Sequence, residues 1–280
     1  TEREVIADEM PTEAVKVQAE QNVLKPWILP TGNDFIKDPA MRHIRPDGNP
    51  GGDFKFVRSD FDDSPWRQLN LPHDWAIEGP FQKGWDSSVD GSMGRLPSPG
   101  IAWYRKKLDI PAGDAGKSIF LDIDGAMSYA MVWLNGKLVG GWPYGYASWR
   151  LDLTPYVVPG GENQLAIRLD NPANSSRWYP GGGIYRNVWL TKTNPVHIGQ
   201  WGTFVTTHDV SKDSAKINLE VTIDNDSKTD VQVVAVTEIF ELDSQGRKTG
   251  TAVGNFKPVK ISVAAGGSAK VESSVVLKNP

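Results

Sequence analysis

The stretch Ala130-Met131-Val132-Trp133-Leu134-Asn135-Gly136-Lys137-Leu138-Val139 decides the fold class of this 280-residue chain. Its first five residues are apolar at successive positions, which is typical of a strand covered on both faces. Asn135-Gly136 is the strongest short hairpin signal, because the favoured two-residue turn needs a positive φ at both positions. The stretch therefore predicts an inner hairpin of a β-sandwich.

The segments on either side of this hairpin alternate between apolar and polar residues. Ile119, Leu121 and Ile123 form one such series, and residues 165–169 form another. A period of two indicates half-buried strands. Many short strands joined by turns and long loops predict a jelly-roll-like sandwich.

The composition changes sharply near residue 200. All eleven tryptophans lie between Trp27 and Trp201, and residues 202–280 contain no tyrosine. This change predicts two domains with a junction near 195–201. In the second domain the alternating series Ile217–Ile223 is followed by three further predicted strands, Val231–Phe240, Val259–Val263 and Ala269–Leu277. Four or more strands in about 80 residues predict an immunoglobulin-like β-sandwich.

The whole chain is therefore predicted to be all-β, with a jelly-roll-like sandwich followed by an immunoglobulin-like sandwich. The predicted domains are an N-terminal arm over residues 1–53 with a short helix near 14–21, a jelly-roll domain over 54–196, and an immunoglobulin-like domain over 197–280. The first residue is Thr1 and no hydrophobic leader precedes it, which is typical of a mature or trimmed protein.

Composition excludes several classes of function. The formal charge of −4 and a pI near 5.6, with no basic patch, argue against nucleic-acid binding. No apolar run approaches the roughly 18 residues of a membrane span. Without cysteine, disulfides and thiolate chemistry are excluded. The four histidines are scattered and no pair has metal-ligand spacing, so no metal site is predicted in this chain.

Three loops carry candidate sugar-binding residues. Arg177, Trp178 and Tyr179 precede a triple glycine, and their aromatic faces and guanidinium suit the C–H faces and hydroxyl edges of a sugar. The alternative is that Trp178 packs on the sandwich while Arg177 pairs on the surface. Asp86, in the loop 84–100, belongs to a possible rim or to a solvated loop. Residues 142–146 offer a stacking platform, although packing in the core or between domains is the simpler interpretation.

Several stretches in register resemble glycoside hydrolase family 2, which includes β-galactosidases, β-glucuronidases and β-mannosidases. They are Leu71-Pro72-His73-Asp74-Trp75, Trp103-Tyr104-Arg105-Lys106, Val132-Trp133-Leu134-Asn135-Gly136, and Gly183-Ile184-Tyr185-Arg186-Asn187-Val188-Trp189-Leu190. Residues 53–196 resemble the family's sugar-binding domain, and residues 197–280 resemble the immunoglobulin-like domain that follows it. The sequences of residues 71–81 and 177–183 are most similar to those of β-galactosidase-type members.

The resemblance implies a role for several of these residues. Many family members carry an acidic residue six positions before the glycine of the Gly-Ile-Tyr-Arg motif, where it binds a sugar hydroxyl; here that position is Arg177. Asp74 lies in a turn that leads to a loop approaching the substrate. It is expected either to accept a hydrogen bond from a sugar hydroxyl or to cap backbone N–H groups.

The family's chemistry is performed by two glutamates of a TIM barrel that follows the two sandwiches. Between residues 21 and 200 the glutamates are Glu78 and Glu162. We therefore expect a non-catalytic N-terminal fragment of a retaining hydrolase of terminal β-glycosides, with β-galactosides the first choice and a β-glucuronidase parent the alternative. The fragment alone is expected to be inactive.

The resemblance also implies partners and a compartment. Expected partners are the carbohydrate substrate, the parent's own TIM barrel and a homo-oligomeric copy, with no nucleic acid and no membrane span. No cofactor is expected in this fragment, whereas the parent is expected to accept Na⁺ or Mg²⁺. The expected location is periplasmic or secreted. Alternatives from other classes are a free-standing carbohydrate-binding module or lectin, and a structural pair of adhesion domains.

Overall fold

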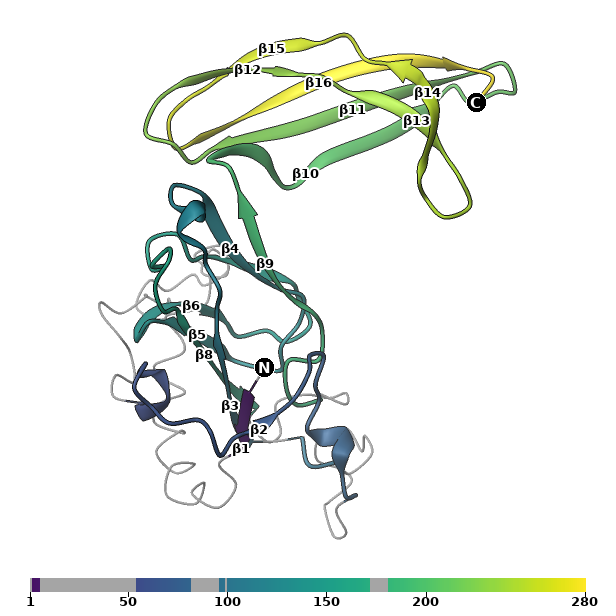
Figure 1. The fold of residues 1–280 in the computed structure, drawn as a ribbon. Coiled ribbons are helices and arrows are strands. Elements are labelled where there is room, and N and C mark those ends of the chain that lie inside the picture. Colours follow the sequence, from purple (N-terminus) through teal and green to yellow (C-terminus); the bar gives the residue numbers. More distant parts are fainter. Residues whose placement is uncertain (1, 6–53, 82–95, 99, 172–180) are drawn as a thin grey trace, which may run out of the picture. The chain divides into compact units, whose positions relative to one another are not determined.

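The computed structural model describes residues 54–81, 96–98, 100–171 and 181–280, together with the backbone of residues 2–5. These residues form two compact units, which divide in the chain at Lys192/Thr193, with residues 116–118 assigned to the second (Figure 1). No helix among the described residues is long and apolar enough to cross a bilayer. The predicted arm over 1–53 and its helix near 14–21 lie outside the described residues, apart from the strand at 2–5.

The described elements are strands and single-turn 3-10 helices. Up to residue 193 they are β1 Glu2–Val5, η3 Lys55–Val57, β2 Arg67–Gln68, η4 Ala76–Glu78, β3 Gly100–Lys107, η6 Ala112–Asp114, β4 Ser118–Ile123, β5 Ala130–Leu134, β6 Lys137–Trp142, β7 Trp149–Asp152, β8 Gln164–Asn171 and β9 Val188–Thr193. The remainder are β10 Val196–His208, β11 Ser214–Asn225, β12 Val231–Ala235, β13 Glu238–Leu242, β14 Lys248–Asn255, β15 Val259–Val263 and β16 Gly267–Lys278. The predicted all-β fold with two sandwiches is confirmed.

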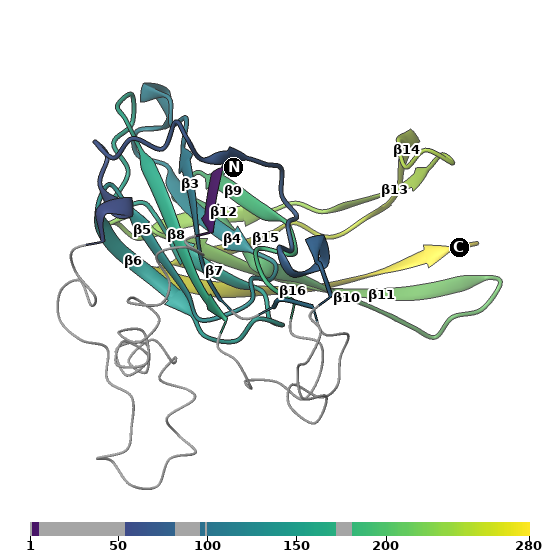
Figure 2. The same cartoon turned by 90° about the horizontal axis from the view of Figure 1, so that it is seen from below.

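The first unit is built from a six-stranded sheet in the order β2-β1-β3-β8-β5-β6 and a three-stranded sheet in the order β7-β4-β9. Figure 2 shows β3, β8, β5 and β6 running side by side. The main core lies between the two sheets, and its members include Ile119, Leu121 and Ile123 of β4, Val132 of β5 and Ile167 of β8. Every second side chain of β4 and β8 faces this core, as the alternation predicts. The prediction of a half-buried strand is wrong for β8, which is buried along its whole length because a second apolar cluster and its covering segment lie on the other face.

The β5–β6 hairpin is buried on both faces. Val132 and Leu134 point into the main core, whereas Met131 and Trp133 belong to a second apolar cluster on the opposite face of the sheet. Asn135 and Gly136 adopt φ values of 54° and 75°, as the two-residue turn requires. The predicted inner hairpin is confirmed.

The second unit pairs β10-β11-β16 in one sheet, β12 with β15, and β13 with β14. Its core includes Leu219, Val221, Ile223 and Val271. The prediction of one strand over Val231–Phe240 is wrong, because this stretch forms β12 and β13. The two halves pair with different partners, β15 and β14, so the strand must break between them.

Candidate functional site

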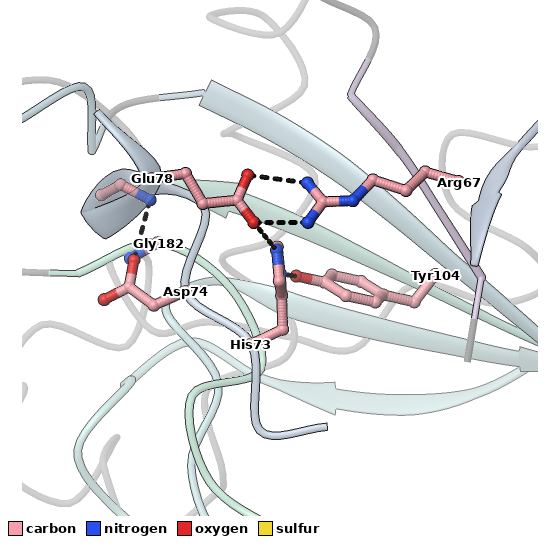
Figure 3. A network of polar contacts seen from close by, with 7 residues as sticks. Arg67, His73, Asp74, Glu78, Tyr104 and Gly182 are labelled. Atoms are coloured by element: carbon pink, nitrogen blue, oxygen red, sulfur yellow. Dashed lines mark hydrogen bonds and ion pairs between the residues drawn. The ribbon is translucent and has the colours of Figure 1, made fainter. Parts of the chain in front are cut away.

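The turn that begins at Leu71 is hydrogen-bonded to residues 181–184, the segment that contains the triple glycine. The backbone N–H of His73 donates to Ile184 O at 2.8 Å, and that of Trp75 donates to Gly182 O at 2.7 Å. Asp74 Oδ1 accepts the N–H of Gly182 and the N–H of Ala76, both at 2.9 Å (Figure 3). Two backbone bonds and one carboxylate thus hold two distant parts of the sequence together, and we call this arrangement the clip.

The glycines of the clip are required by close contacts. A Cβ on Gly182 would overlap the indole of Trp75, and a Cβ on Gly183 would overlap the carbonyl of His73 and lie 2.8 Å from the Tyr104 hydroxyl. Gly183 also adopts a φ of 128°, which L side chains rarely adopt. Gly183 therefore has to be glycine on two grounds, its positive φ and the close approach of neighbouring atoms.

A buried histidine lies at the centre of the clip. His73 Nδ1 lies 3.0 Å from the Tyr104 hydroxyl, and His73 Nε2 lies 3.0 Å from Glu78 Oε1. Arg67 donates to both Glu78 oxygens, from Nη1 to Oε2 at 2.7 Å and from Nη2 to Oε1 at 2.8 Å (Figure 3). The four side chains come from β2, the clip turn, η4 and β3, so the network fixes the turn on the sheet.

The same contacts determine the charge of Glu78. Hydrogen bonds from Arg67, and secondarily from His73, lower the pKa of the Glu78 carboxyl to about 2 against the cost of burial. Glu78 is therefore ionised at neutral pH and cannot donate a proton there. The side chain of Glu162, in the turn before β8, is 81% exposed, with Oε1 4.0 Å from Lys107 Nζ.

Two loop stems meet beside the clip. Asn171, which is 1% exposed, donates from Nδ2 to Ser98 O at 2.8 Å and to Gly181 O at 2.7 Å. Ser128 Oγ donates to Asn171 Oδ1 at 3.2 Å. Ser98 lies at the end of the candidate loop 84–100, which we call the first loop. Asn171 and Gly181 flank residues 172–180, which hold Arg177, Trp178 and Tyr179 and which we call the second loop. One buried amide therefore brings the stems of both loops to the same end of the sandwich.

The predicted site residues fall in two groups. Asp86, Arg177, Trp178 and Tyr179 lie outside the described residues, and their sugar-binding role stays a prediction. Asp74 is described, and its Oδ1 performs the backbone capping that the sequence offered as one alternative. Its contact with a sugar hydroxyl also stays a prediction.

Sequence reasoning assigned no structural role to Arg67, Glu78 or Asn171. The Arg67–Glu78 pair is 11 residues apart and follows no helical or strand spacing, so no local pattern indicates it. Asn171 ends a strand and precedes a proline, which is a signal for a turn but not for a buried amide. Tyr104 lies in a stretch that carries the family resemblance, and this was the available signal for it.

Comparison with known proteins shows which family this chain belongs to. Residues 100–179 match the family model described as the glycosyl hydrolase 2 galactose-binding domain-like domain. A β-galactosidase of Bacteroides ovatus is 44% identical over 199 residues, which cover 71% of this chain and 23% of that protein. The chain belongs to glycoside hydrolase family 2.

Other family 2 proteins are similar over the same region. A putative β-glucuronidase of Formosa agariphila is 36% identical over 169 residues, covering 60% of this chain and 16% of the relative. The crystal structure of a family 2 member from Bacteroides cellulosilyticus matches with a TM-score of 0.71 and 33% identity, over 82% of this chain and 29% of that one. The chain thus spans less than a third of the length of these family 2 proteins.

Proposed function

We propose that this chain is the sugar-binding, non-catalytic portion of a retaining hydrolase that removes terminal β-linked sugars, with β-galactosides as the first substrate class. The observation that supports this most is the clip at one end of a family 2 sandwich. There, Asn171 joins the stems of the two loops that hold the candidate sugar-binding residues, and Asp74 fixes the second stem at Gly182. Rigid support for loops is the arrangement that a binding site needs.

In this proposal the chain supplies one wall of the sugar subsite. Trp178 and Tyr179 offer flat faces to the apolar C–H faces of a pyranose, while Arg177 donates to a hydroxyl or carboxylate. The clip fixes the stem that follows Tyr179, because the N–H of Gly182 donates to Asp74. The wall binds and orients the terminal sugar, which lowers the entropic cost of reaching the reactive geometry.

The chemical step is assigned to a part of the parent protein outside this chain. A retaining hydrolase needs an acid/base carboxyl and a nucleophilic carboxylate about 5–5.5 Å apart. Glu78 is ionised, so it cannot act as the acid, and both of its oxygens accept hydrogen bonds from Arg67, which makes it a poor nucleophile. Glu162 lies exposed in a turn beside Lys107, where the described residues form no enclosure for a sugar. We assign the two carboxyls to a TIM barrel of the parent, which we also propose to be periplasmic or secreted.

A β-glucuronidase parent is the second candidate. Arg177 replaces the acidic residue that many family members have at this position, and a guanidinium pairs with a carboxylate in bidentate fashion. The relatives that match this chain include proteins described as β-glucuronidases. A glucuronide would supply such a carboxylate, whereas a galactoside would not.

The test uses the protein encoded by the complete reading frame. We expect it to hydrolyse 4-nitrophenyl β-D-galactoside, and Arg177→Ala to lower kcat/KM by about tenfold or more through the lost contact. The control is Arg58→Ala, which removes an exposed arginine paired with Asp60 in the same unit and is expected to retain activity. Preference for 4-nitrophenyl β-D-glucuronide would select the second candidate. Hydrolysis of neither glycoside would overturn the proposal.

A calorimetric titration distinguishes the lectin alternative. Half of the proposed pocket lies elsewhere in the parent, so we expect the 280-residue chain to show no tight binding of galactose, that is, none below millimolar concentration. Tight, saturable binding of galactose to this chain alone would favour a free-standing carbohydrate-binding module. Activity of the complete protein that is indifferent to Arg177, Trp178 and Tyr179 would instead favour a purely structural role.

A further inference from the structure

The loop between β6 and β7 presents two tyrosines to solvent. Tyr144 is 57% exposed and Tyr146 is 40% exposed, and their ring centroids lie 5.5 Å apart in an edge-to-face arrangement at 61°. Trp142, at the start of the same stretch, packs against the core of the first unit. The prediction of core packing therefore holds for Trp142 and is wrong for the two tyrosines, whereas packing between domains stays a prediction.

The tyrosine pair rests on a rigid support. The Tyr185 hydroxyl donates to Gly145 O at 2.9 Å, so the residue between the two tyrosines is fixed in place. A Cβ on Gly145 would overlap Met127 Sδ, and a Cβ on Gly125 would lie 2.9 Å from the Tyr185 ring. Glycine at these two positions lets three turns stack closely, so the backbone between the two tyrosines is fixed before any ligand arrives.

A cation lies on the same support. The Arg186 guanidinium carbon is 5.5 Å from the Tyr185 ring centroid, within cation–π range, and the residue is exposed. The site also adjoins the clip, because Met127, which backs onto Gly145, forms a backbone bridge with Gly183. Exposed aromatic rings, phenol hydroxyls and a guanidinium thus gather beside the stem of the second loop.

We propose that Tyr144, Tyr146 and Arg186, supported by Tyr185, form an additional saccharide-binding subsite for a β-linked oligosaccharide. A pyranose has an apolar C–H face that stacks on a tyrosine ring, while its hydroxyls accept from Arg186 and from the phenols. The preformed support reduces the ordering cost of binding. In its choice of ligand class, a saccharide, this inference rests on the proposed function.

The test is an NMR titration of the 280-residue chain with β-1,4-galactotetraose at millimolar concentration. We expect saturable shifts of the Tyr144, Tyr146 and Arg186 amide signals. Tyr144→Ala and Tyr146→Ala are each expected to weaken binding by about fivefold. Tyr144→Phe keeps the ring and is expected to bind within about twofold of the original chain. Phe204→Ala removes an exposed ring of the second unit and is the matched control.

Three outcomes would overturn this subsite: no saturable shift, shifts confined to other residues, or an equal loss in Phe204→Ala. Circular dichroism of each variant shows whether it is folded. Because both tyrosines are exposed, we expect both alanine variants to fold. Failure of the proposed function has a different signature, since it would appear as a complete protein that hydrolyses neither glycoside while this chain still binds the tetrasaccharide.

Discussion

Asp74 Oδ1 accepts the backbone N–H of Gly182 at 2.9 Å, which joins two turns 108 residues apart in the chain. The same oxygen accepts the N–H of Ala76, so a single carboxylate closes its own turn and joins it to the triple glycine. This relationship makes Asp74 a positioning residue for the loop end of the first sandwich.

Removing this carboxylate should loosen both turns. Asp74→Ala leaves two N–H groups without their acceptor, and we expect it to lower the free energy of unfolding by roughly 1–3 kcal/mol. Asp74→Asn keeps an oxygen acceptor and should lose less. Urea denaturation followed by tryptophan fluorescence measures both changes.

The matched control for Asp74 is Asp62. Its Oδ1 accepts the N–H of Ser64 at 3.0 Å, so it closes a similar local turn, but it is exposed and bonds within that turn. Asp62→Ala should leave the unfolding curve almost unchanged. Equal destabilisation by the two substitutions would contradict the bridging role of Asp74.

Stability should depend on pH through Glu78. Its pKa is lowered in the folded state from 4.5 to about 2, so its stabilising contribution is complete above pH 4.5 and is lost as the pH falls toward 2. Because the side chain is 39% exposed, solvent screening reduces this contribution to about 1 kcal/mol. Glu78→Gln should remove this part of the pH dependence, as measured by urea unfolding at several pH values. An unchanged pH profile would contradict the Arg67–Glu78 pairing.

Gly183 should not tolerate a side chain. Its φ of 128° and its contacts with His73 O and the Tyr104 hydroxyl leave no room for a Cβ, so Gly183→Ala should cost about 2 kcal/mol or more. Gly113→Ala is the control, because a Cβ there meets nothing within 4 Å. Thermal unfolding of the two variants compares them, and similar midpoints would contradict the close approach at Gly183.

Arg105 should be essential for the segment that covers the second apolar cluster. It is 1% exposed, donates from Nε to Asp63 Oδ2 at 2.6 Å, and donates from Nη1 to the carbonyls of Phe56 and Arg58. Arg105→Ala takes this donor away from the Asp63 carboxylate and from two carbonyls, and should cost about 3–5 kcal/mol. Calorimetry measures the loss. A loss no larger than that of Arg58→Ala, which removes an exposed side chain, would contradict this role.

Sequence patterns predicted the strands well where burial has a regular period. Ile119–Ile123 and the Asn135-Gly136 turn were predictable because alternation and positive φ leave local signatures. The break between β12 and β13 was not, because it arises from a change of pairing partner that the apolar run 231–240 does not reveal.

The candidate site was predictable only in part. Asp74 and the glycines stood out because their residue types suit turns and caps. The buried amide of Asn171 and the Arg67–Glu78 pair connect segments that are separated in sequence, and such contacts depend on the tertiary fold rather than on local propensity. Tyr144 and Tyr146 do not pack in the core of the first unit, because the turn carries their rings outward, and composition alone does not reveal this.

The central claim is that this chain shapes a sugar site without performing the chemistry. The most direct measurement is the hydrolysis of 4-nitrophenyl β-D-galactoside and β-D-glucuronide by the purified 280-residue chain, beside the protein from the complete reading frame. We predict no turnover above buffer for the chain alone and clear turnover for the complete protein. Hydrolysis that co-purifies with the chain alone and disappears in Glu78→Gln would contradict the claim.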